Sequence, residues 1–404
     1  MRSALDVCRA LAAFTETPGS ITRTFLSPPM RNCHRVLSSW MKDLGMQVHV
    51  DAVGNLLGLY GTGNRARLLM GSHLDTVPNA GAYDGVLGVC IALAVIDAIK
   101  DSALPFDIEV LGFSEEEGVR FRTPFLGSLA ATGRFDLELL DLKDSTGCTM
   151  REAISQFGLD PAHIEDARID SRAFAFLEFH IEQGPMLDAA GESLAAVSAI
   201  AGQSRLEVIF SGRANHAGTT PMNSRRDALA GAAEWISAVE EHAQSVDGLV
   251  STVGALQVSP GVGNVIPGEV RASLDVRHSC DNTRLAAVQH LRSEAERIAA
   301  SRSLRVQFEE RLNQNAVLMD EHLAGLIEKA MLRIGETPRH MVSGAGHDAM
   351  IMAEKVPSAM IFLRSPGGIS HHPDESVRAE DVEKAIRLGV AMLADLGTEF
   401  ERPT

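Results

Sequence analysis

The chain has 404 residues, a length that predicts two or three domains rather than one core. Hydrophobic residues make up 45% and charged residues 22%, as in soluble globular proteins, and the longest uncharged apolar run, residues 86–96, is too short to cross a bilayer. The short apolar run argues against a membrane protein, and the net charge of −16, with no basic run to neutralise phosphates, argues against a nucleic-acid partner. An anionic substrate would therefore depend on local arginines.

The first residues predict an amphipathic helix rather than a secretion signal. Asp6 and Arg9 lie where a signal peptide would need its apolar core. The five cysteines are odd in number and never spaced as Cys-x-x-Cys, so neither a disulfide framework nor a zinc–thiolate site is indicated. A reducing cytosol is the expected compartment.

A loop after an apolar strand carries the first candidate metal ligands. Residues 68–70, Leu-Leu-Met, predict a buried strand that leads into His73 and Asp75, and a polar loop then delivers Asp84. A histidine at a strand tip can hold a metal ion, while Asp75 is close enough to hold the second ring nitrogen and fix the tautomer. The run 86–96 predicts a buried helix behind this loop. Taken alone, such a histidine is usually a satisfied polar residue, and Asp-Gly is usually a turn.

Three further apolar strands end in residues of the same chemical types. Because these strands alternate with helices, we predict an α/β fold with a mainly parallel sheet covered by helices, in which ligands gather at the carboxyl ends of the strands. Taken alone, the acidic run Glu115-Glu116-Glu117 would be the solvated start of a helix. The strands are residues 106–114 before Glu115-Glu116-Glu117, residues 173–179 before His180, and residues 356–363 before His371-His372.

The pattern changes between residues 204 and 317, where the order of elements is βαββαβ, as in ferredoxin-like folds. We therefore predict a catalytic domain of residues 1–203 and 318–404, interrupted by a smaller domain of residues 204–317. The expected strands of the insertion are 205–210, 249–258, 270–277 and 304–308, and its expected helices are 227–246 and 283–302.

Together these motifs resemble one family, the M20 metallopeptidase-like amidohydrolases, and within it the hydantoinase/carbamoylase branch. The resemblance covers nearly the whole chain, and the motifs are highly specific in this order. They are Gly71-Ser-His-Leu-Asp-Thr-Val, Tyr83-Asp-Gly, Glu116-Glu-Gly-Val-Arg-Phe121, His180-Ile-Glu-Gln-Gly-Pro, Asn215-His-Ala-Gly-Thr-Thr-Pro-Met222, Asn264-Val-Ile-Pro-Gly268, Asp275-Val-Arg277, Ser343-Gly-Ala-Gly-His-Asp-Ala349 and Gly368-Ile-Ser-His371.

The resemblance implies a site for two divalent metal ions. Imidazole and carboxylate ligands without thiolate suit Zn²⁺, Mn²⁺ or Co²⁺. His371 is favoured over its neighbour His372 because it directly follows Gly-Ile-Ser, as the family's ligand does. The implied ligands are His73 and His180 on different ions, Asp84 bridging both ions, and Glu117 and His371 as the remaining two.

Glu116 resembles the family's general base, which takes a proton from the attacking water and returns it to the leaving nitrogen. This assignment depends on aligning Glu116 and Glu117 with the Gly118 that follows, and Glu115 is the alternative base. Asp75 would orient the neighbouring histidine ligand.

The inserted domain resembles the family's lid and dimerisation domain, which implies a homodimer. In it, His216, Asn264 and Arg277 match residues that close over the substrate. Arg277 would hold a substrate carboxylate, and His216 would donate to the developing oxyanion. Taken alone, Arg277 would be expected to form a surface salt bridge, and His216 would be expected to lie in a turn. The further substrate contacts that the resemblance implies are Gln183, Gly344 and Ala345.

The implied activity is hydrolysis of the ureido (carbamoyl) amide of a small carboxylate, with release of ammonia and carbon dioxide. The loops around 76–81 and 343–349 are most similar to those of allantoate amidohydrolases, and N-carbamoyl-L-amino acid hydrolysis, including that of β-ureidopropionases, is the alternative. Cleavage of dipeptides or N-acyl amino acids fits less well, because the motifs that begin at Glu116 and His180 belong to the carbamoylase branch. A metal-stabilised ureide-binding protein without activity is the non-enzymatic alternative, against which an intact Glu116 argues.

Overall fold

The structure, a computed structural model, describes residues 2–400 and divides into two compact units. Among the described residues, unit 1 comprises 2–198 and 319–400, and unit 2 comprises 199–318. The sequence placed these two junctions at 203/204 and 317/318. Each unit has its own core of buried apolar side chains.

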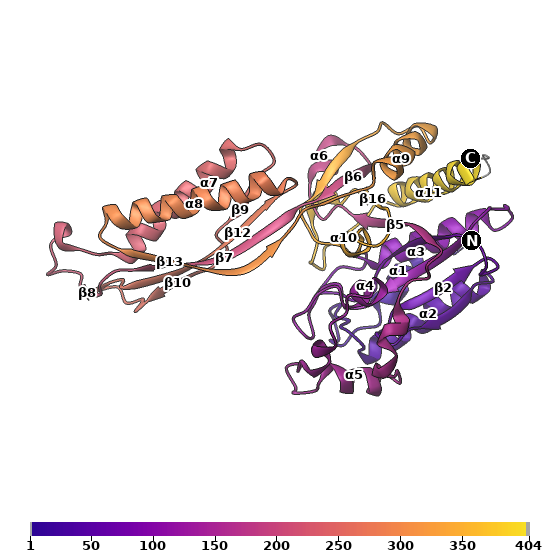
Figure 1. Ribbon diagram of the computed structural model, residues 1–404, viewed down its shortest axis with the longest axis horizontal. Helices are drawn as coiled ribbons and strands as arrows, with labels where there is room; N and C mark the ends of the chain where they lie inside the picture. The colour runs from indigo at the N-terminus through magenta and orange to yellow at the C-terminus, as the bar shows by residue number, and fades with distance from the viewer. Residues whose placement is uncertain (1, 401–404) are drawn as a thin grey trace. The chain divides into compact units, whose positions relative to one another are not determined.

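The larger sheet has nine strands, and its central strands run parallel (Figure 1). Along the sheet the order is β1-β2-β4-β3-β5-β16-β6-β14, with β15 also paired to β6. The pairs β4–β3, β3–β5 and β5–β16 are parallel, so their carboxyl ends lie at one edge, and the predicted mainly parallel sheet is confirmed. The strands are β1 (Gln47–Val50), β2 (Leu56–Tyr60), β3 (Arg67–His73), β4 (Asp107–Phe113), β5 (Ala173–Ile181), β6 (Leu194–Ile200), β14 (Val317–Leu318), β15 (His340–Ser343) and β16 (Ser358–Leu363).

Helix α3 (Val86–Ile99) forms the centre of the unit 1 core. All but one of its residues are buried, because it packs on β3 and β5 and is covered by two further helices. Burying each large aliphatic side chain there stabilises the fold by about 1.5–3 kcal/mol. This confirms the buried helix predicted behind the metal loop. The covering helices are α1 (Ala4–Ala12) and α11 (Ala379–Phe400).

The other helices of unit 1 are shorter or lie farther from this centre. Helix α1 begins at an N-cap serine, Ser3, whose hydroxyl accepts from the main-chain N–H of Asp6, and its apolar side faces the core, as predicted. The others are α2 (Pro28–Asp43), α4 (Leu126–Ala131), α5 (Met150–Gln156), α6 (Met186–Ala190), α9 (Glu321–Arg333), α10 (Asp348–Met352) and the 3₁₀ turns at Leu137–Asp141, Pro161–Ala167 and Pro366–Gly368.

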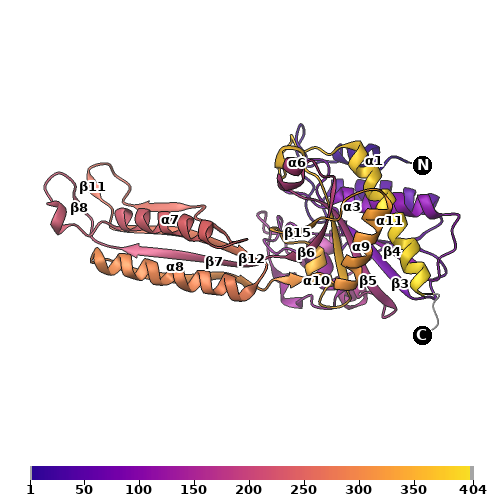
Figure 2. The ribbon, with the colours of Figure 1, turned by 90° about the horizontal axis from the view of Figure 1, so that it is seen from above.

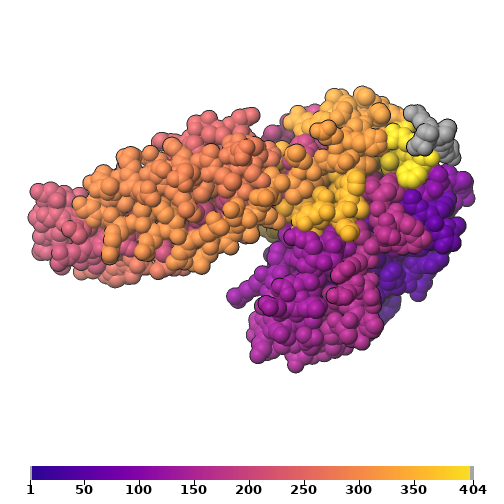
Figure 3. Space-filling view, viewed as in Figure 1, coloured from indigo at the N-terminus to yellow at the C-terminus, as the bar shows by residue number. Residues whose placement is uncertain are grey.

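Unit 2 is an antiparallel sheet with two helices on one face. The strand order is β10-β12-β7-β13, and β12 shows the strict alternation of buried and half-buried residues that was predicted for residues 270–277. Helices α7 and α8 lie side by side on the sheet, and α8 covers the face of unit 2 seen in Figure 3. The elements are β7 (Gly202–Ser211), β8 (Asn215–His216), α7 (Ala228–Ser245), β9 (Val250–Thr252), β10 (Leu256–Ser259), β11 (Val265–Ile266), β12 (Glu269–His278), α8 (Asp281–Ser301), β13 (Arg305–Gln314) and the 3₁₀ turn Met222–Ser224.

The prediction of a single strand at residues 249–258 is wrong, because the structure has two strands there. Both β9 and β10 pair with β12, but the segment between them leaves the ladder. At this break, the main-chain N–H of Ala255 donates to the hydroxyl of Ser273 at 2.8 Å, and the N–H of Ser273 donates to the carbonyl of Ala255. The side-chain hydroxyl thus replaces a ladder bond that periodicity alone cannot reveal.

Two expectations from composition can also be compared with the structure. All five cysteines, which lie in the described part of the chain, have free thiols. Among residues 2–400, no helix is both long and apolar enough to cross a membrane.

Candidate functional site

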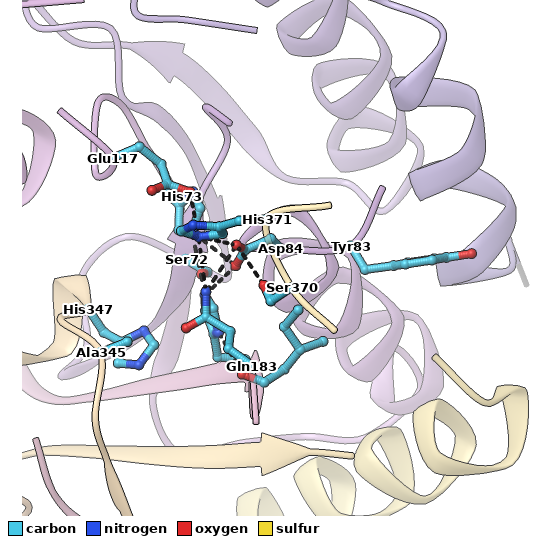
Figure 4. Close-up of polar contacts among 12 residues, drawn as sticks. Ser72, His73, Tyr83, Asp84, Glu117, Gln183, Ala345, His347, Ser370 and His371 are labelled. Atoms are coloured by element: carbon cyan, nitrogen blue, oxygen red, sulfur yellow. Dashed lines mark hydrogen bonds and ion pairs between the residues drawn. The ribbon is translucent and has the colours of Figure 1, made fainter. Parts of the chain in front are cut away.

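The carboxyl ends of the four central strands bring the predicted ligand residues together. His73 is the last residue of β3, His180 is next to last in β5, and the acidic run follows β4. The loop after β16 supplies His371. Figure 4 shows the side chains of His73, His371 and Gln183 around the carboxylate of Asp84.

The carboxylate of Asp84, only 3% exposed, is the centre of this cluster. Its Oδ1 lies 3.2 Å from Nε2 of His180 and 3.8 Å from Nε2 of His73, whereas its Oδ2 lies 3.0 Å from Nε2 of His371. Oδ1 is buried and makes no hydrogen bond. A buried carboxylate oxygen without a donor, facing two imidazole nitrogens, is an arrangement that a divalent cation would complete.

The two oxygens of Asp84 face two different groups of possible ligand atoms. On one side are His73 and His180, and on the other are Glu117 and His371, whose Oε1 and Nε2 are 3.5 Å apart. In each group, with Asp84 included, the ligand atoms lie within 4.8 Å of one another. The residues present therefore fit two adjacent metal ions that share Asp84.

This grouping differs from the expectation that His73 and His180 bind different ions. Their Nε2 atoms are 3.4 Å apart and both face Oδ1 of Asp84. Two imidazole nitrogens that share a tetrahedral zinc ion, each at 2.0–2.1 Å, would be separated by roughly 3.4 Å. The geometry thus favours one ion for both histidines, because β3 and β5 are neighbouring strands.

The backbone of Gly85 allows the Asp84 loop to approach His73. Gly85 has a φ of 66°, and a Cβ placed on it would lie 2.4 Å from the imidazole of His73. A side chain at this position would both strain the backbone and displace the ring. The Asp-Gly pair is therefore required by the site and is not merely a turn.

Asp75 supports the site differently from the expectation. Nδ1 of His73 lies 3.0 Å from the main-chain oxygen of Asp75, whereas the carboxylate is 3.7 Å away. The Asp75 carboxylate instead accepts from the main-chain N–H groups of Glu116 at 3.0 Å and Glu117 at 3.1 Å. Asp75 thereby ties the β3 tip to the acidic turn after β4.

One of the three glutamates of that turn, Glu115, has different partners from the other two. Glu115 has a φ of 52°, and its carboxylate accepts from the main-chain N–H groups of Arg120 at 2.7 Å, Phe25 at 3.2 Å and Phe121 at 3.4 Å. Glu116 and Glu117, in contrast, have carboxylate oxygens close to His73. Glu115 is therefore occupied as a backbone clamp, which leaves Glu116 as the better-placed base.

Burial and mutual repulsion shift the pKa values of the site. Burial lowers the pKa of His180 to about 4 and raises that of Glu117 to about 7. Burial also raises the pKa of Glu116 well above its ordinary value. For Asp84, the contacts with His371 and His73 outweigh burial and lower the pKa well below its usual range. Divalent cations, if bound here, would stabilise such a concentration of buried acids in its charged form.

The remaining sequence-predicted residues of unit 1 also have defined places. His372 is turned away, since its Nδ1 accepts from the main-chain N–H of Asp374 at 3.2 Å. Gln183 donates from Nε2 to Oδ2 of Asp84 at 3.0 Å, and its Oε1 is buried without a partner. Gly344 and Ala345 form a turn in which the N–H of Ala345 donates to the hydroxyl of Ser343 at 3.2 Å.

Comparison with known proteins assigns this arrangement to a family. The sequence profile of Peptidase family M20/M25/M40 matches residues 69–395. The chain belongs to this family. Its membership makes the protein a hydrolase that acts on C–N bonds, as the motifs predicted.

Named relatives and solved structures match the M20 chain over almost its full length. The probable allantoate deiminase of Oryza sativa subsp. japonica is 36% identical and covers 93% of this chain and 84% of its own length. The N-carbamoyl-L-amino acid amidohydrolase of Geobacillus stearothermophilus is 38% identical, covering 90% of each. A hydantoinase/carbamoylase family amidase from Burkholderia multivorans has a TM-score of 0.91 at 33% identity, covering 97% of this chain and 96% of that one.

The M20 site also contains buried polar residues that the sequence did not single out. Glu178 accepts from the hydroxyl of Ser72 at 2.8 Å and from the main-chain N–H of Ala349 at 2.9 Å. His347 packs against the ring of His180, with centroids 4.5 Å apart. A signal existed for Glu178, because residues two apart on a strand share a face and Glu178 precedes His180 by two.

Unit 2 places its predicted substrate residues at two separate points. His216 in β8 and Asn264 just before β11 are neighbours, since these strands pair and the N–H of Ala217 donates to the carbonyl of Asn264. Arg277 lies near the far end of β12, and its Nε and Nη2 donate to the carboxylate of Asp275 at 2.8 and 3.0 Å. His216 is exposed and Arg277 is partly buried.

Proposed function

We propose that this M20 protein is a binuclear metal-dependent amidohydrolase that cleaves the ureido C–N bond of allantoate and releases ammonia and carbon dioxide. The observation that carries this proposal is the Asp84 carboxylate, with three imidazole nitrogens within 3.8 Å of its two oxygens and an oxygen that lacks a donor. The similarity to proteins named allantoate deiminase, at 34–36% identity, supports the substrate.

The donor set suits Zn²⁺, Mn²⁺ or Co²⁺. One ion would be held by His73, His180 and Asp84, and the other by Asp84, Glu117 and His371. When bound, two such ions polarise the scissile carbonyl and lower the pKa of a water molecule. The site would then resemble other binuclear hydrolase sites, in which a carboxylate is shared between the ions.

Within this site, Glu116 would act as the general base and acid. It is 8% exposed, and the Asp75 carboxylate accepts a hydrogen bond from its main-chain N–H. It takes a proton from the attacking water and delivers it to the leaving nitrogen. The unpaired Oε1 of Gln183 can accept a hydrogen bond from a ureido N–H group of the substrate.

N-Carbamoyl-L-amino acid hydrolysis is the second candidate, because a relative that is 38% identical is named N-carbamoyl-L-amino acid amidohydrolase. Both substrates combine a ureido group with a carboxylate, so the metal centre alone does not separate them. A substrate panel with ammonia detection does. We expect allantoate to have the highest kcat/KM, and a tenfold or greater advantage of an N-carbamoyl-L-amino acid would reverse the assignment.

The metal requirement has its own test. Chelation should abolish turnover, and Mn²⁺, Co²⁺ or Zn²⁺ should restore it. Elemental analysis of fully active enzyme should give two ions per chain. One ion or fewer in fully active protein would contradict the binuclear site while leaving the choice of substrate open.

We also propose that unit 2 is a ferredoxin-like lid and dimerisation domain, and that His216 completes the site of a partner subunit. Glu269 and Arg277 of β12 pair with Ser211 and Gln203 at opposite ends of β7, and the hairpin with His216 follows the Ser211 end (Figure 2). Eight residues of strand span about 27 Å. One copy of unit 2 is therefore too long to offer both His216 and Arg277 to one small substrate.

Complementation tests this arrangement. Mixing inactive His216→Ala subunits with inactive Glu116→Gln subunits should restore activity, because one of the two sites in a mixed dimer then has both wild-type residues. A mixture of His216→Ala with Arg277→Ala is informative as well, since recovery there shows that the two residues serve one site from different chains. Failure of both mixtures after proven subunit exchange would contradict the shared site.

A further inference from the structure

A buried glutamate outside the ligand set connects two of the ligand loops. Glu375 is 6% exposed and follows His371 by four residues. Its Oε1 accepts from the main-chain N–H of Tyr83 at 2.9 Å and from that of Asp84 at 3.1 Å. Its Oε2 accepts from the hydroxyl of Ser370 at 3.2 Å. One side chain thus holds the Asp84 turn and the residue directly before His371.

The loop of His371 needs such a support because its backbone is strained. His371 has a φ of 54°, in the left-handed region that residues other than glycine adopt at a cost in free energy. Its side chain is 47% exposed, whereas the Asp84 side chain is 3% exposed. The hydroxyl oxygen of Ser370, seen beside Asp84 in Figure 4, lies 3.4 Å from Oδ2 of Asp84, which is the alternative acceptor for its one proton. The exposed ligand is therefore joined to the buried one through Ser370 and Glu375.

Tight packing keeps Glu375 in place. A Cβ added to Gly81 would lie 2.3 Å from both Cβ and Oε1 of Glu375. The glutamate therefore lies directly against the backbone of the loop that carries Asp84. A shift of Glu375 toward Gly81 would have to move this loop.

We propose that Glu375 is a positioning residue that sets the distance between the Asp84 and His371 loops and thereby determines how tightly the divalent metal ions are retained. This role rests on the proposed metal-dependent function. The hydrogen-bond partners of Glu375 are Tyr83, Asp84 and Ser370. Its effect comes through the two main-chain N–H groups and one hydroxyl that it orients.

The test measures metal affinity directly. Apo Glu375→Ala and Glu375→Gln are titrated with Mn²⁺ against a chelating indicator, and the dissociation constants are compared with those of the wild type. Groups that orient metal ligands typically contribute 10- to 100-fold in affinity. We expect such a loss for Glu375→Ala and a smaller loss, between twofold and tenfold, for Glu375→Gln, because the Gln carbonyl still accepts from the N–H groups of Tyr83 and Asp84, whereas its NH₂ group cannot accept from the Ser370 hydroxyl. Saturating Mn²⁺ should restore most of the kcat of Glu375→Ala.

Asp107 offers a matched control at the opposite end of the sheet. It is fully buried and, like Glu375, accepts from main-chain N–H groups, those of Thr62 at 3.0 Å, Gly63 at 2.8 Å and Arg65 at 3.2 Å. Asp107→Asn should lower the melting temperature but leave Mn²⁺ affinity within twofold of the wild type.

The proposal is overturned if Glu375→Ala binds Mn²⁺ within twofold of the wild type, or if Asp107→Asn loses as much affinity as Glu375→Ala. Should Glu375→Ala fail to fold, the milder Glu375→Gln decides, with unchanged affinity counting against the role. A wild type that binds a single ion would contradict the binuclear function. The role of Glu375 would still be tested, since Asp84 belongs to both ligand groups.

Discussion

Unit 1 and unit 2 differ in the side chains that they bury. At the carboxyl ends of its strands, unit 1 buries imidazoles and carboxylates side by side, among them His73, Asp84 and Glu116. In unit 2, all of whose residues the structure describes, Arg284 is the only buried charged side chain. It is paired with Asp281 at 2.8 Å. Unit 1 therefore carries charge in its interior, whereas unit 2 has an apolar core.

The two units therefore differ in where their candidate functional side chains lie, in the interior of unit 1 and on the surface of unit 2. A buried group of like charges costs free energy of folding, and it persists because the packed strands and cations hold it in one geometry. The substrate residues expected in unit 2 are instead exposed or paired on the surface of a stable scaffold. Mutations should accordingly have larger and more pH-dependent effects in unit 1 than in unit 2.

The largest effect should come from the base. Glu116→Gln should lower kcat by roughly 10²- to 10⁴-fold, because a positioned acid–base group contributes that much. The metal content should stay unchanged, as measured by elemental analysis of the purified variant. Glu117→Gln is the matched variant at the next residue, and it should lose metal as well as activity.

The distinction between a base at Glu116 and a metal ligand at Glu117 would fail if the two variants had the same metal content and the same activity. A near-normal kcat of Glu116→Gln would show that the base is another group. Glu115→Gln is the control, since the Glu115 carboxylate accepts main-chain N–H groups and should affect stability more than kcat.

The second effect concerns the pH dependence of unit 1 stability. His34 is 6% exposed, its Nε2 has no partner, and burial, with help from Arg23 and Arg31, lowers its pKa to about 4. The unfolded chain takes up this proton near pH 6.5, so the stability that neutral His34 contributes is fully present above pH 6.5 and is lost as the pH falls toward 4. Since one pH unit is worth about 1.4 kcal/mol, the loss reaches about 3 kcal/mol.

Urea unfolding of the apo protein at pH 7.5 and pH 4 checks this. Relative to the wild type, His34→Leu should gain about 3 kcal/mol on going to the lower pH. A constant difference between the two proteins at both pH values would show that His34 is not buried in its neutral form.

The third effect lies in unit 2. Arg277→Ala should lower kcat/KM by roughly ten- to a few hundred-fold, because a hydrogen bond to a charged group is worth about 1.5–3 kcal/mol. Arg277→Lys should recover only part of this loss, since a guanidinium fork suits a carboxylate better than an ammonium does. The measurement also uses the amide of the substrate's carboxylate. If the mutation impaired hydrolysis of this analogue equally, Arg277 would not be the carboxylate receiver.

The smallest effect should come from the strand break of unit 2. Ser273→Ala removes the hydroxyl that accepts from the main-chain N–H of Ala255, at a cost of about 1 kcal/mol. Metal content should be unchanged. A loss of metal in this variant would contradict the expectation that a substitution in unit 2 leaves the site of unit 1 unchanged.

Much of the site could be predicted from local patterns. A histidine at the end of an apolar run, or an acidic run after another, is visible because strand ends and turns are read from neighbouring residues. The parallel sheet then follows from alternation with helices. In contrast, Glu375 and Glu178 are buried polar residues whose partners lie 291 and 106 positions away in the chain. No local pattern reveals such partners.

The sequence by itself determined the residue types of the metal centre, the strands that carry them and the family to which the chain belongs. Only the tertiary structure decided which candidate ligands lie together, since His73 and His180 meet through the neighbouring strands β3 and β5. It also decided that Asp75 clamps the acidic turn and that Glu115 faces away from the site. The physical reason is that hydrophobic periodicity specifies which face a residue occupies, whereas hydrogen bonds between distant loops depend on how the folded elements pack.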